Sequence, residues 1–329
     1  GNANLIAESD FSPTSALVTL TSDMLRVSKL QLTTEAIPTG TFFSKQLYRS
    51  TTGGTTKFPW LELDGNVLTS VEDDLSDAGL QLVAAPTDLG APPKFDLIVE
   101  WKDRLWGKSN VDIDTLYQSA INKAYAWPSS RTIPIPPRKG DEVGINGFLR
   151  RKDELGVGRR DALHKIVGTN TVNFTRQIVT DRIGIWAPDS CVTVDDIGYF
   201  LGNPFGVYSW GPGGVTNLTH ERVRAWFETD TDFNRSQFDK AVAMYEPTLH
   251  SVIIFLSAAG STDLDRWIQY DIATGAWWGP HKTGAFTPSC TLTAADTNDT
   301  PVAMVGSSDV FFLWQEQATR TDGTATSID

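Results

Sequence analysis

Long apolar stretches are missing from this chain of 329 residues. Its longest apolar runs, such as residues 252–256, hold only a few residues, whereas a membrane-spanning helix needs about 20. Positive charge is also scarce, because 40 Asp and Glu outnumber 28 Lys and Arg and give a net charge of -12. We therefore expect no membrane span and no specific binding to a nucleic-acid backbone, which requires a basic surface.

Cysteine and histidine, the usual ligands of structural metals, are few. Cys191 and Cys290 are the only cysteines, and each lies in a strand-like context that is typical of small core residues. Whether they pair stays open, since a disulfide requires that their strands be neighbours. The four histidines lie at positions 164, 220, 250 and 281 without paired spacing. This pattern argues against a zinc site.

One segment begins like a calcium-binding loop. Asp230, Asp232 and Asn234 have the spacing of the first ligands. The match then ends, because Arg235 stands where the loop needs a sharp-turn glycine and Ala241 where it needs a bidentate glutamate. Motifs for a serine nucleophile or a phosphate-binding loop are also missing. The sequence therefore predicts no metal and no cofactor.

Helix signals and targeting signals are weak as well. Residues 115–125 and 220–227 could form short helices, but neither has an apolar stripe with capping residues. Residues 1–4 lack the basic start and apolar core of a secretory signal. The first residue is not Met, which is compatible with a processed protein or a fragment of a longer one.

Short strands separated by turn residues are what the sequence does contain. Residues 185–219 hold four runs rich in Val, Ile, Tyr, Phe and Trp, punctuated by Asp-Asp, Gly-Asn-Pro and Gly-Pro-Gly-Gly. Such runs are typical of antiparallel strands joined by tight turns. Together they predict one small sheet, about the size of a propeller blade.

The same pattern divides the chain into three parts. Residues 1–90 hold strand candidates at roughly ten-residue spacing, which favours a small β-sandwich. The strand candidates of this part are residues 17–20, 25–32, 41–49, 58–63 and 68–71. Residues 91–318 hold five groups of strands, and about 40 to 45 residues per blade gives five or six blades of a β-propeller. Besides the runs in residues 185–219, the strand candidates of this part are residues 95–101, 104–108, 116–120, 143–149, 154–157, 162–167, 238–245, 251–256, 266–271, 276–278, 291–295, 303–306 and 310–314. Residues 319–329 are small and polar and are expected to form a flexible tail.

An ordered series of motifs resembles one protein family. Residues 46–54 read QLYRSTTGG, residues 103–107 DRLWG and residues 116–120 LYQSA; Trp127-Pro128 and the strand series of residues 184–210 follow. This order is similar to that of bacteriophage tail-associated β-propeller proteins with a fibronectin-III-like domain, the class that includes the nozzle or hub of short-tailed phages. The resemblance covers roughly residues 41–314. It departs at residues 148–158, where FLRRKDELGVG replaces a plain apolar strand.

The resemblance implies a fold, a role and a location. It implies an all-β protein in which a fibronectin-III-like sandwich precedes the propeller. The role implied is that of a non-catalytic structural protein of the virion, which forms a homo-oligomeric ring with other proteins of the phage tail. If the chain lines the path of the genome, the charge of -12 predicts an acidic channel with at most transient passage of DNA.

Two kinds of residue are candidates for an interface. One is the basic cluster of Arg150, Arg151, Lys152, Arg159 and Arg160. It fits either a strand edge protected by charge or a docking patch for an acidic neighbour. The other kind is Trp60 and Trp127, which adjoin prolines and could be exposed anchors or a sugar platform. The remaining strand tryptophans are expected between blades: Trp101, Trp106, Trp210, Trp267, Trp277 and Trp314.

The alternative function is a secreted carbohydrate-active or carbohydrate-binding propeller, either a glycosidase or sialidase or an adhesion module, with an extracellular location. Glycoside hydrolysis needs two facing carboxylates. The nearest candidates, Asp195-Asp196 and Asp263 with Asp265, fall in predicted turns. Solvated turn residues explain them without catalysis, so the sequence favours a protein that is not an enzyme.

Overall fold

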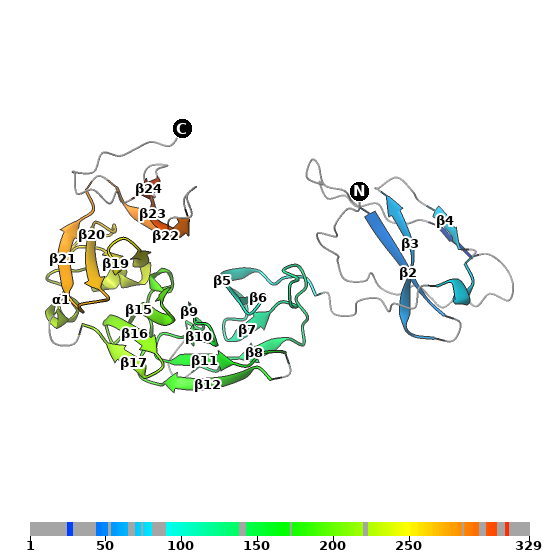
Figure 1. The fold of residues 1–329 in the computed structure, drawn as a ribbon, viewed down its shortest axis with the longest axis horizontal. Coiled ribbons are helices and arrows are strands. Elements are labelled where there is room, and N and C mark those ends of the chain that lie inside the picture. Colours follow the sequence, from blue (N-terminus) through cyan, green and yellow to red (C-terminus); the bar gives the residue numbers. More distant parts are fainter. Residues whose placement is uncertain are drawn as a thin grey trace. The chain divides into compact units, whose positions relative to one another are not determined.

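The computed structural model describes residues 25–28, 44–51, 54–64, 70–73, 75–80, 90–137, 143–171, 173–219, 223–284, 286–295, 301–307 and 313–315. The chain divides into two compact units. The first comprises Gly1–Pro92 together with Tyr125–Pro128, and the second comprises Pro93–Ala124 and Ser129–Asp329. Figure 1 shows that both units are built almost entirely of strands.

Two antiparallel strand pairs form the described part of the first unit. Strand β1 (Leu25–Ser28) pairs with β4 (Ser70–Asp73), and β2 (Ser44–Ser50) pairs with β3 (Lys57–Asp64). A short 3-10 turn follows at Asp77–Gly79. The expected strand at residues 17–20 and the tail at 319–329 lie outside the described residues. The fibronectin-III-like connectivity of this unit therefore stays a prediction.

The described part of the second unit forms a series of five antiparallel sheets, each made of consecutive strands. The first sheet is β5 (Phe95–Trp101), β6 (Arg104–Ser109), β7 (Thr115–Gln118) and β8 (Thr132–Pro134). The second is β9 (Gly147–Arg150), β10 (Glu154–Gly158), β11 (Leu163–Val167) and β12 (Thr175–Thr180). The third is β13 (Gly184–Ile185), β14 (Val192–Val194), β15 (Ile197–Asn203), β16 (Gly206–Gly211) and β17 (Gly214–Asn217).

The fourth and fifth sheets continue the series. The fourth is β18 (Val242–Glu246), β19 (Ser251–Leu256), β20 (Arg266–Asp271) and β21 (Trp277–Lys282). The fifth is β22 (Pro288–Ala295), β23 (Pro301–Ser307) and β24 (Leu313–Gln315). A 3-10 turn at Pro188–Ser190 lies within the third sheet. Helix α1 (Arg224–Glu228) and a 3-10 helix at Arg235–Lys240 connect the third sheet to the fourth.

Successive sheets pack face to face. One buried cluster joins the first and second sheets through Trp106 and Leu155, and another joins the second and third through Leu149 and Phe200. Two more join the third to the fourth and the fourth to the fifth. One edge strand of each sheet (β5, β9, β14, β18 and β22) lies next to that of the following sheet. Consecutive antiparallel sheets that meet along such strands have the architecture of a β-propeller, so the predicted all-β fold is confirmed.

Local predictions were right in part. Strand β7 confirms the strand predicted at residues 116–120, and a bridged turn follows it where a short helix was the alternative. Its alternating burial explains the strand, because Leu116 and Gln118 point inward while their neighbours are half-buried. Residues 238–240 end a 3-10 helix, whereas a strand was expected from 238. Strand β12 was not predicted at all.

Candidate functional site

The predicted basic cluster is divided between the interior and the surface. Arg151, at the end of β9, is 6% exposed and lies where three sheets meet. Its backbone carbonyl accepts a hydrogen bond from Trp101 Nε1 of the first sheet, at 2.8 Å. Its Nε donates to the Asp196 carbonyl of the third sheet at 2.7 Å, and its guanidinium lies 4.8 Å from the Trp210 ring centroid.

Two carboxylates neutralise the buried Arg151. Its guanidinium pairs with Glu154 across the β9–β10 turn and with Asp196 Oδ2 at 3.1 Å. Glu154 also accepts from Lys165 Nζ at 2.6 Å, and Asp196 Oδ1 accepts from the Lys152 N–H at 2.6 Å. A buried charge is tolerated only when it is paired in this way. Arg151 therefore fastens sheets together and is not available to a partner.

Arg159 is also an interior residue. It is fully buried after β10, where Nη1 pairs with Asp114 Oδ1 at 2.6 Å and donates to the Ile135 carbonyl at 2.8 Å. His164 on β11 is only 4% exposed. Burial, together with smaller contributions from the positive charges of Arg176 and Arg159, lowers its pKa to about 4. Both residues therefore support the packing of the second sheet.

Only part of the basic cluster reaches solvent. Arg150 is exposed and pairs with Glu100 of β5 at 2.6 Å, and Lys152 is exposed in the β9–β10 turn. Arg160 is half-buried, with its guanidinium 4.2 Å from the Trp186 ring centroid. Because Arg151 and Arg159 are buried, the hypothesis of a continuous docking patch is corrected. Arg150 lies at the edge of the sheet, where charge discourages strand pairing.

Which tryptophans are buried and which are exposed differs in part from the prediction. Trp127 is 5% exposed and donates its backbone N–H to the Gly90 carbonyl at 2.7 Å, so it is not an exposed anchor. Trp60 on β3 is half-buried. Trp101, Trp106 and Trp210 are buried between sheets, as predicted. Among the residues that the structure describes, Trp278 on β21 has an indole that is 57% exposed, and no pattern in the sequence distinguishes it from the adjacent Trp277.

Three polar side chains, those of Tyr245, His250 and Asp195, link the fourth sheet to the third. Tyr245 Oη lies 2.9 Å from His250 Nδ1, and His250 Nε2 lies 3.7 Å from Asp195 Oδ2. Burial raises the pKa of the nearby Tyr199 to about 12, with smaller contributions from Tyr270 and Asp195. The Asp195 side chain is 76% exposed. A solvated pair at this distance contributes little energy, so we interpret it as a surface link between sheets.

The two candidate pairs of carboxylates lie near opposite ends of strand β19. Asp195 and Asp196 lie beside the β18–β19 turn. The contact between Asp195 and His250, a residue of that turn, places them there. Asp265 lies in the loop at the other end of the six-residue strand β19 and accepts the Ala258 N–H at 2.7 Å. Six residues of strand span about 20 Å, whereas glycosidase carboxylates lie about 5–9.5 Å apart. These residues hold turns in place.

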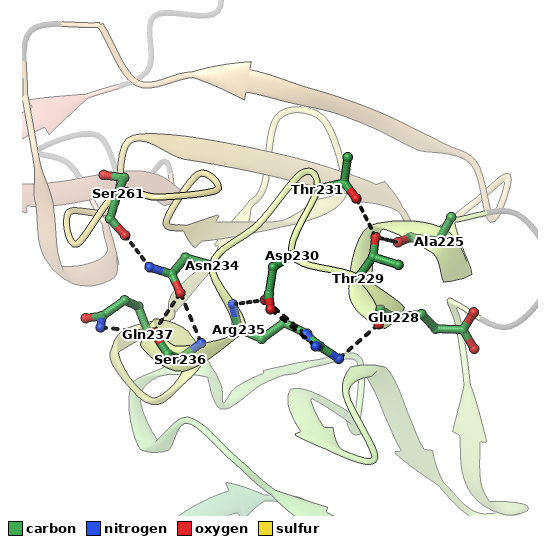
Figure 2. Close-up of polar contacts among 10 residues, drawn as sticks. All are labelled: Ala225, Glu228, Thr229, Asp230, Thr231, Asn234, Arg235, Ser236, Gln237 and Ser261. Carbon is green, nitrogen blue, oxygen red and sulfur yellow. Dashed lines mark hydrogen bonds and ion pairs between the residues drawn. The ribbon is translucent and has the colours of Figure 1, made fainter.

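In the segment that begins like a calcium-binding loop, the side chain of Arg235 supplies a positive charge beside Asp230 (Figure 2). Asp230 Oδ1 accepts from the backbone N–H and Nε of Arg235 at 3.1 and 3.0 Å, and Arg235 Nη1 donates to the Glu228 carbonyl at 2.9 Å. The hydrogen bond from the Arg235 side chain lowers the pKa of Asp230. Asn234 caps the following 3-10 helix and donates to the Ser261 carbonyl at 2.7 Å. The guanidinium thus engages the carboxylate that would be the first calcium ligand.

Within the described ranges, no group of three or more His, Cys, Asp or Glu side chains could hold a metal ion. The same ranges contain no helix with the length and apolar character that crossing a membrane requires. Cys191 is half-buried and Cys290 exposed, and both are free thiols. They belong to the third and fifth sheets, respectively, so they do not form a disulfide.

Comparison with known proteins gives no family. No family model matches the chain, and no curated protein matches its sequence. Among solved structures, the extracellular domain of a one-component system from B. thetaiotaomicron is 10% identical with a TM-score of 0.43, and it covers 92% of this chain. The N-terminal domain of Nup159 is 8% identical with a TM-score of 0.44, covering 68% of the chain. Streptogramin B lyase is 10% identical with a TM-score of 0.40, covering 91%.

These likenesses extend over different shares of the matched proteins. The chain spans 35% of the bacterial extracellular protein, 60% of the Nup159 domain and 88% of the lyase. Identities of 10% or less and TM-scores below 0.5 carry no argument about function. The function has to be argued from the sequence motifs and the contacts described above.

Proposed function

We propose that this chain is a non-catalytic structural protein of a bacteriophage tail, similar to the nozzle or hub proteins of short-tailed phages. The ordered series of motifs carries the proposal. Residues 46–50 of the first motif lie on β2, residues 103–107 cross the β5–β6 turn, and residues 116–118 lie on β7. Residues 184–210 run from β13 to β16. The motif pieces thus fall on strands and turns, which supports the proposal.

The contacts between sheets support a mechanical role. Successive sheets are joined by buried aromatic side chains and by Arg151, which contacts residues of three sheets. Contacts of this kind give a rigid body, because protein interiors are close-packed. The exposed charges on β5 are paired, Asp96 with Lys108 at 2.5 Å and Glu100 with Arg150 at 2.6 Å. The prediction of an acidic channel remains part of the proposal.

Immunogold electron microscopy tests the proposal directly. Antibodies against the recombinant chain are applied to purified particles of the phage whose genome encodes it. We expect gold on the tail and several copies per particle by quantitative mass spectrometry. Particles without the chain would overturn the proposal. Turnover on a glycan panel would instead favour the carbohydrate-active alternative.

A further inference from the structure

Arg104, on β6 of the first sheet, is a buried cation that has no carboxylate partner among the described residues. It is 7% exposed, and its Nη1 donates to the Ser119 carbonyl at 2.9 Å. The other buried Lys and Arg of the described residues each pair with a carboxylate, as Lys108–Asp96, Arg151–Glu154, Arg151–Asp196 and Arg159–Asp114. A buried charge is costly unless it is paired. Arg104 therefore stands out as a cation whose counter-anion the described residues do not supply.

A second cation lies beside Arg104. Arg131 immediately precedes β8, and its carbonyl accepts the Gln118 N–H at 3.2 Å. Burial lowers the pKa of Arg104, with a smaller contribution from the positive charge of Arg131. Two like charges near each other repel, so the fold holds these guanidinium groups together at a cost. An anion bound between them offsets both the repulsion and the burial of Arg104.

The Gln118 side chain lies on the same face of the sheet. Arg104 and Trp106 are two positions apart on β6 and therefore point to one side. Gln118 on β7 lies directly opposite Trp106, which makes it a diagonal neighbour of Arg104, at a separation that long side chains can bridge. Gln118 is 3% exposed, and its Oε1 has no hydrogen-bond partner. Because buried amides nearly always have partners, this oxygen indicates a site for a hydrogen-bond donor.

Phe174 of the second sheet leaves the guanidinium of Arg104 able to bind a ligand. The Phe174 ring centroid lies 5.8 Å from Arg104 Cζ and 5.0 Å from the Trp106 ring centroid. A guanidinium has five N–H donors in one plane, and Ser119 accepts from one nitrogen. Contact with an aromatic ring uses none of these donors. Arg104 therefore keeps N–H groups for the oxygens of an anion.

We propose that Arg104, Arg131 and Gln118 form a binding site for hydrogen phosphate. The two guanidinium groups donate to the phosphate oxygens and balance the double negative charge. The single O–H of hydrogen phosphate donates to Gln118 Oε1. A carboxylate lacks the second charge and sulfate lacks the O–H, so neither satisfies all three residues. The three residues belong to the second unit, and the inference does not depend on the proposed role in a phage tail.

Isothermal titration calorimetry of the full chain with inorganic phosphate tests the site. The titration is done at pH 8, where phosphate is mainly doubly charged, and at constant ionic strength, because salt screens the binding of any anion. We expect saturable binding at one site. Sulfate and glucose 6-phosphate, whose dianions have no O–H, should bind about tenfold more weakly because Gln118 stays unpaired. Acetate, with one charge, should bind more weakly than sulfate. The glucose 6-phosphate titration distinguishes free phosphate from a phosphorylated molecule.

Three variants assign the binding to these residues. Arg104→Gln removes a charge and its donors and should weaken phosphate binding by about tenfold or more. Gln118→Leu removes the acceptor, so phosphate and sulfate should bind this variant equally. Arg182→Gln, at an exposed site, is the matched control and should bind phosphate like the parent. Circular dichroism verifies folding, and Arg131→Gln, at a half-buried site, replaces Arg104→Gln if the latter does not fold.

Three outcomes would overturn the inference. The first is a parent chain without saturable phosphate binding, and the second is an unchanged phosphate affinity in the folded Arg104→Gln or Arg131→Gln variant. The third is equal affinity of the parent for phosphate and sulfate, which would remove hydrogen phosphate as the ligand. Melting temperatures give an independent readout, because a bound ligand stabilises the folded state. Phosphate should raise that of the second unit more in the parent and in Arg182→Gln than in Arg104→Gln. An equal rise in all three, as the exclusion of phosphate from protein surfaces produces, would count against the site.

Discussion

Arg151 illustrates how one buried charge can organise several elements. Residues 150–152 read as an exposed basic edge in the sequence, and two of the three are exposed. Arg151 differs because the alternation of a strand turns it inward, onto Trp210 and between Glu154 and Asp196. Sequence alone could not identify which of three adjacent cations would be buried, because the acidic partner Asp196 belongs to a different sheet.

We expect Arg151→Met to destabilise the second unit by about 2–4 kcal/mol, since it removes the buried pair and leaves the two carboxylates and the Asp196 carbonyl without this donor. Urea denaturation at neutral pH measures the change. Arg150→Met is the matched control, because it breaks only an exposed pair and should stay within about 0.5 kcal/mol of the parent. Equal effects of the two variants would contradict the assigned role of Arg151.

His164 makes stability depend on pH. Its folded-state pKa is about 4, below the ordinary value of 6.5, so the unfolded chain binds more protons between these two values. The free energy of unfolding therefore falls as the pH decreases from about 6.5 toward 4. His164→Gln should flatten this part of the stability profile in urea titrations at a series of pH values.

At the scale of elements, strands with apolar alternation or aromatic residues were predictable. Strands β15, β16, β19 and β20 fall within the expected runs, because their composition and turns act locally. Strand β12 was missed, since it is a largely exposed outer strand of its sheet with few apolar positions. The charged segment 148–158 departs from the family pattern, yet it forms the two predicted strands as the β9–β10 hairpin, and Arg151 between them also pairs with Asp196 of another sheet.

The candidate site was less predictable than the fold. Burial of Arg151, Arg159 and Trp127 depends on contacts between segments far apart in the sequence, such as the 45 positions that separate Arg159 from Asp114. The placement of Arg104 and Gln118 on one face follows from strand register, which local composition does not give. Composition indicates which residues could act, whereas the packing of sheets decides which of them reach the surface.

Close contact between sheets should make Gly156 on β10 intolerant of any side chain. A Cβ at this position would lie 2.6 Å from the Trp210 ring and 3.1 Å from Leu149 Cβ. We expect Gly156→Ala to destabilise the second unit by about 1–3 kcal/mol through overpacking, measured by urea denaturation. Gly213→Ala is the control, because nothing lies within 4 Å of its added Cβ. A neutral Gly156→Ala would show that the second and third sheets are packed less tightly than described.

At the scale of the whole molecule, two compact units predict two unfolding events. Gly90→Ala should lower the melting temperature of the first unit only, because its Cβ would lie 1.9 Å from the Trp127 carbonyl oxygen within that unit. Differential scanning calorimetry measures both transitions, and Arg151→Met assigns the second one. A single transition that shifts with both variants would mean that the units unfold together.

Each sheet of the second unit consists of strands that follow one another directly in the chain. During translation, a sheet can therefore make its main-chain hydrogen bonds as soon as its own residues leave the ribosome, without waiting for distant segments. The apolar faces of the sheet, in contrast, stay exposed to solvent until the next sheet has been synthesised. Nascent chains stalled between two sheets should consequently attract chaperones more strongly than the finished protein.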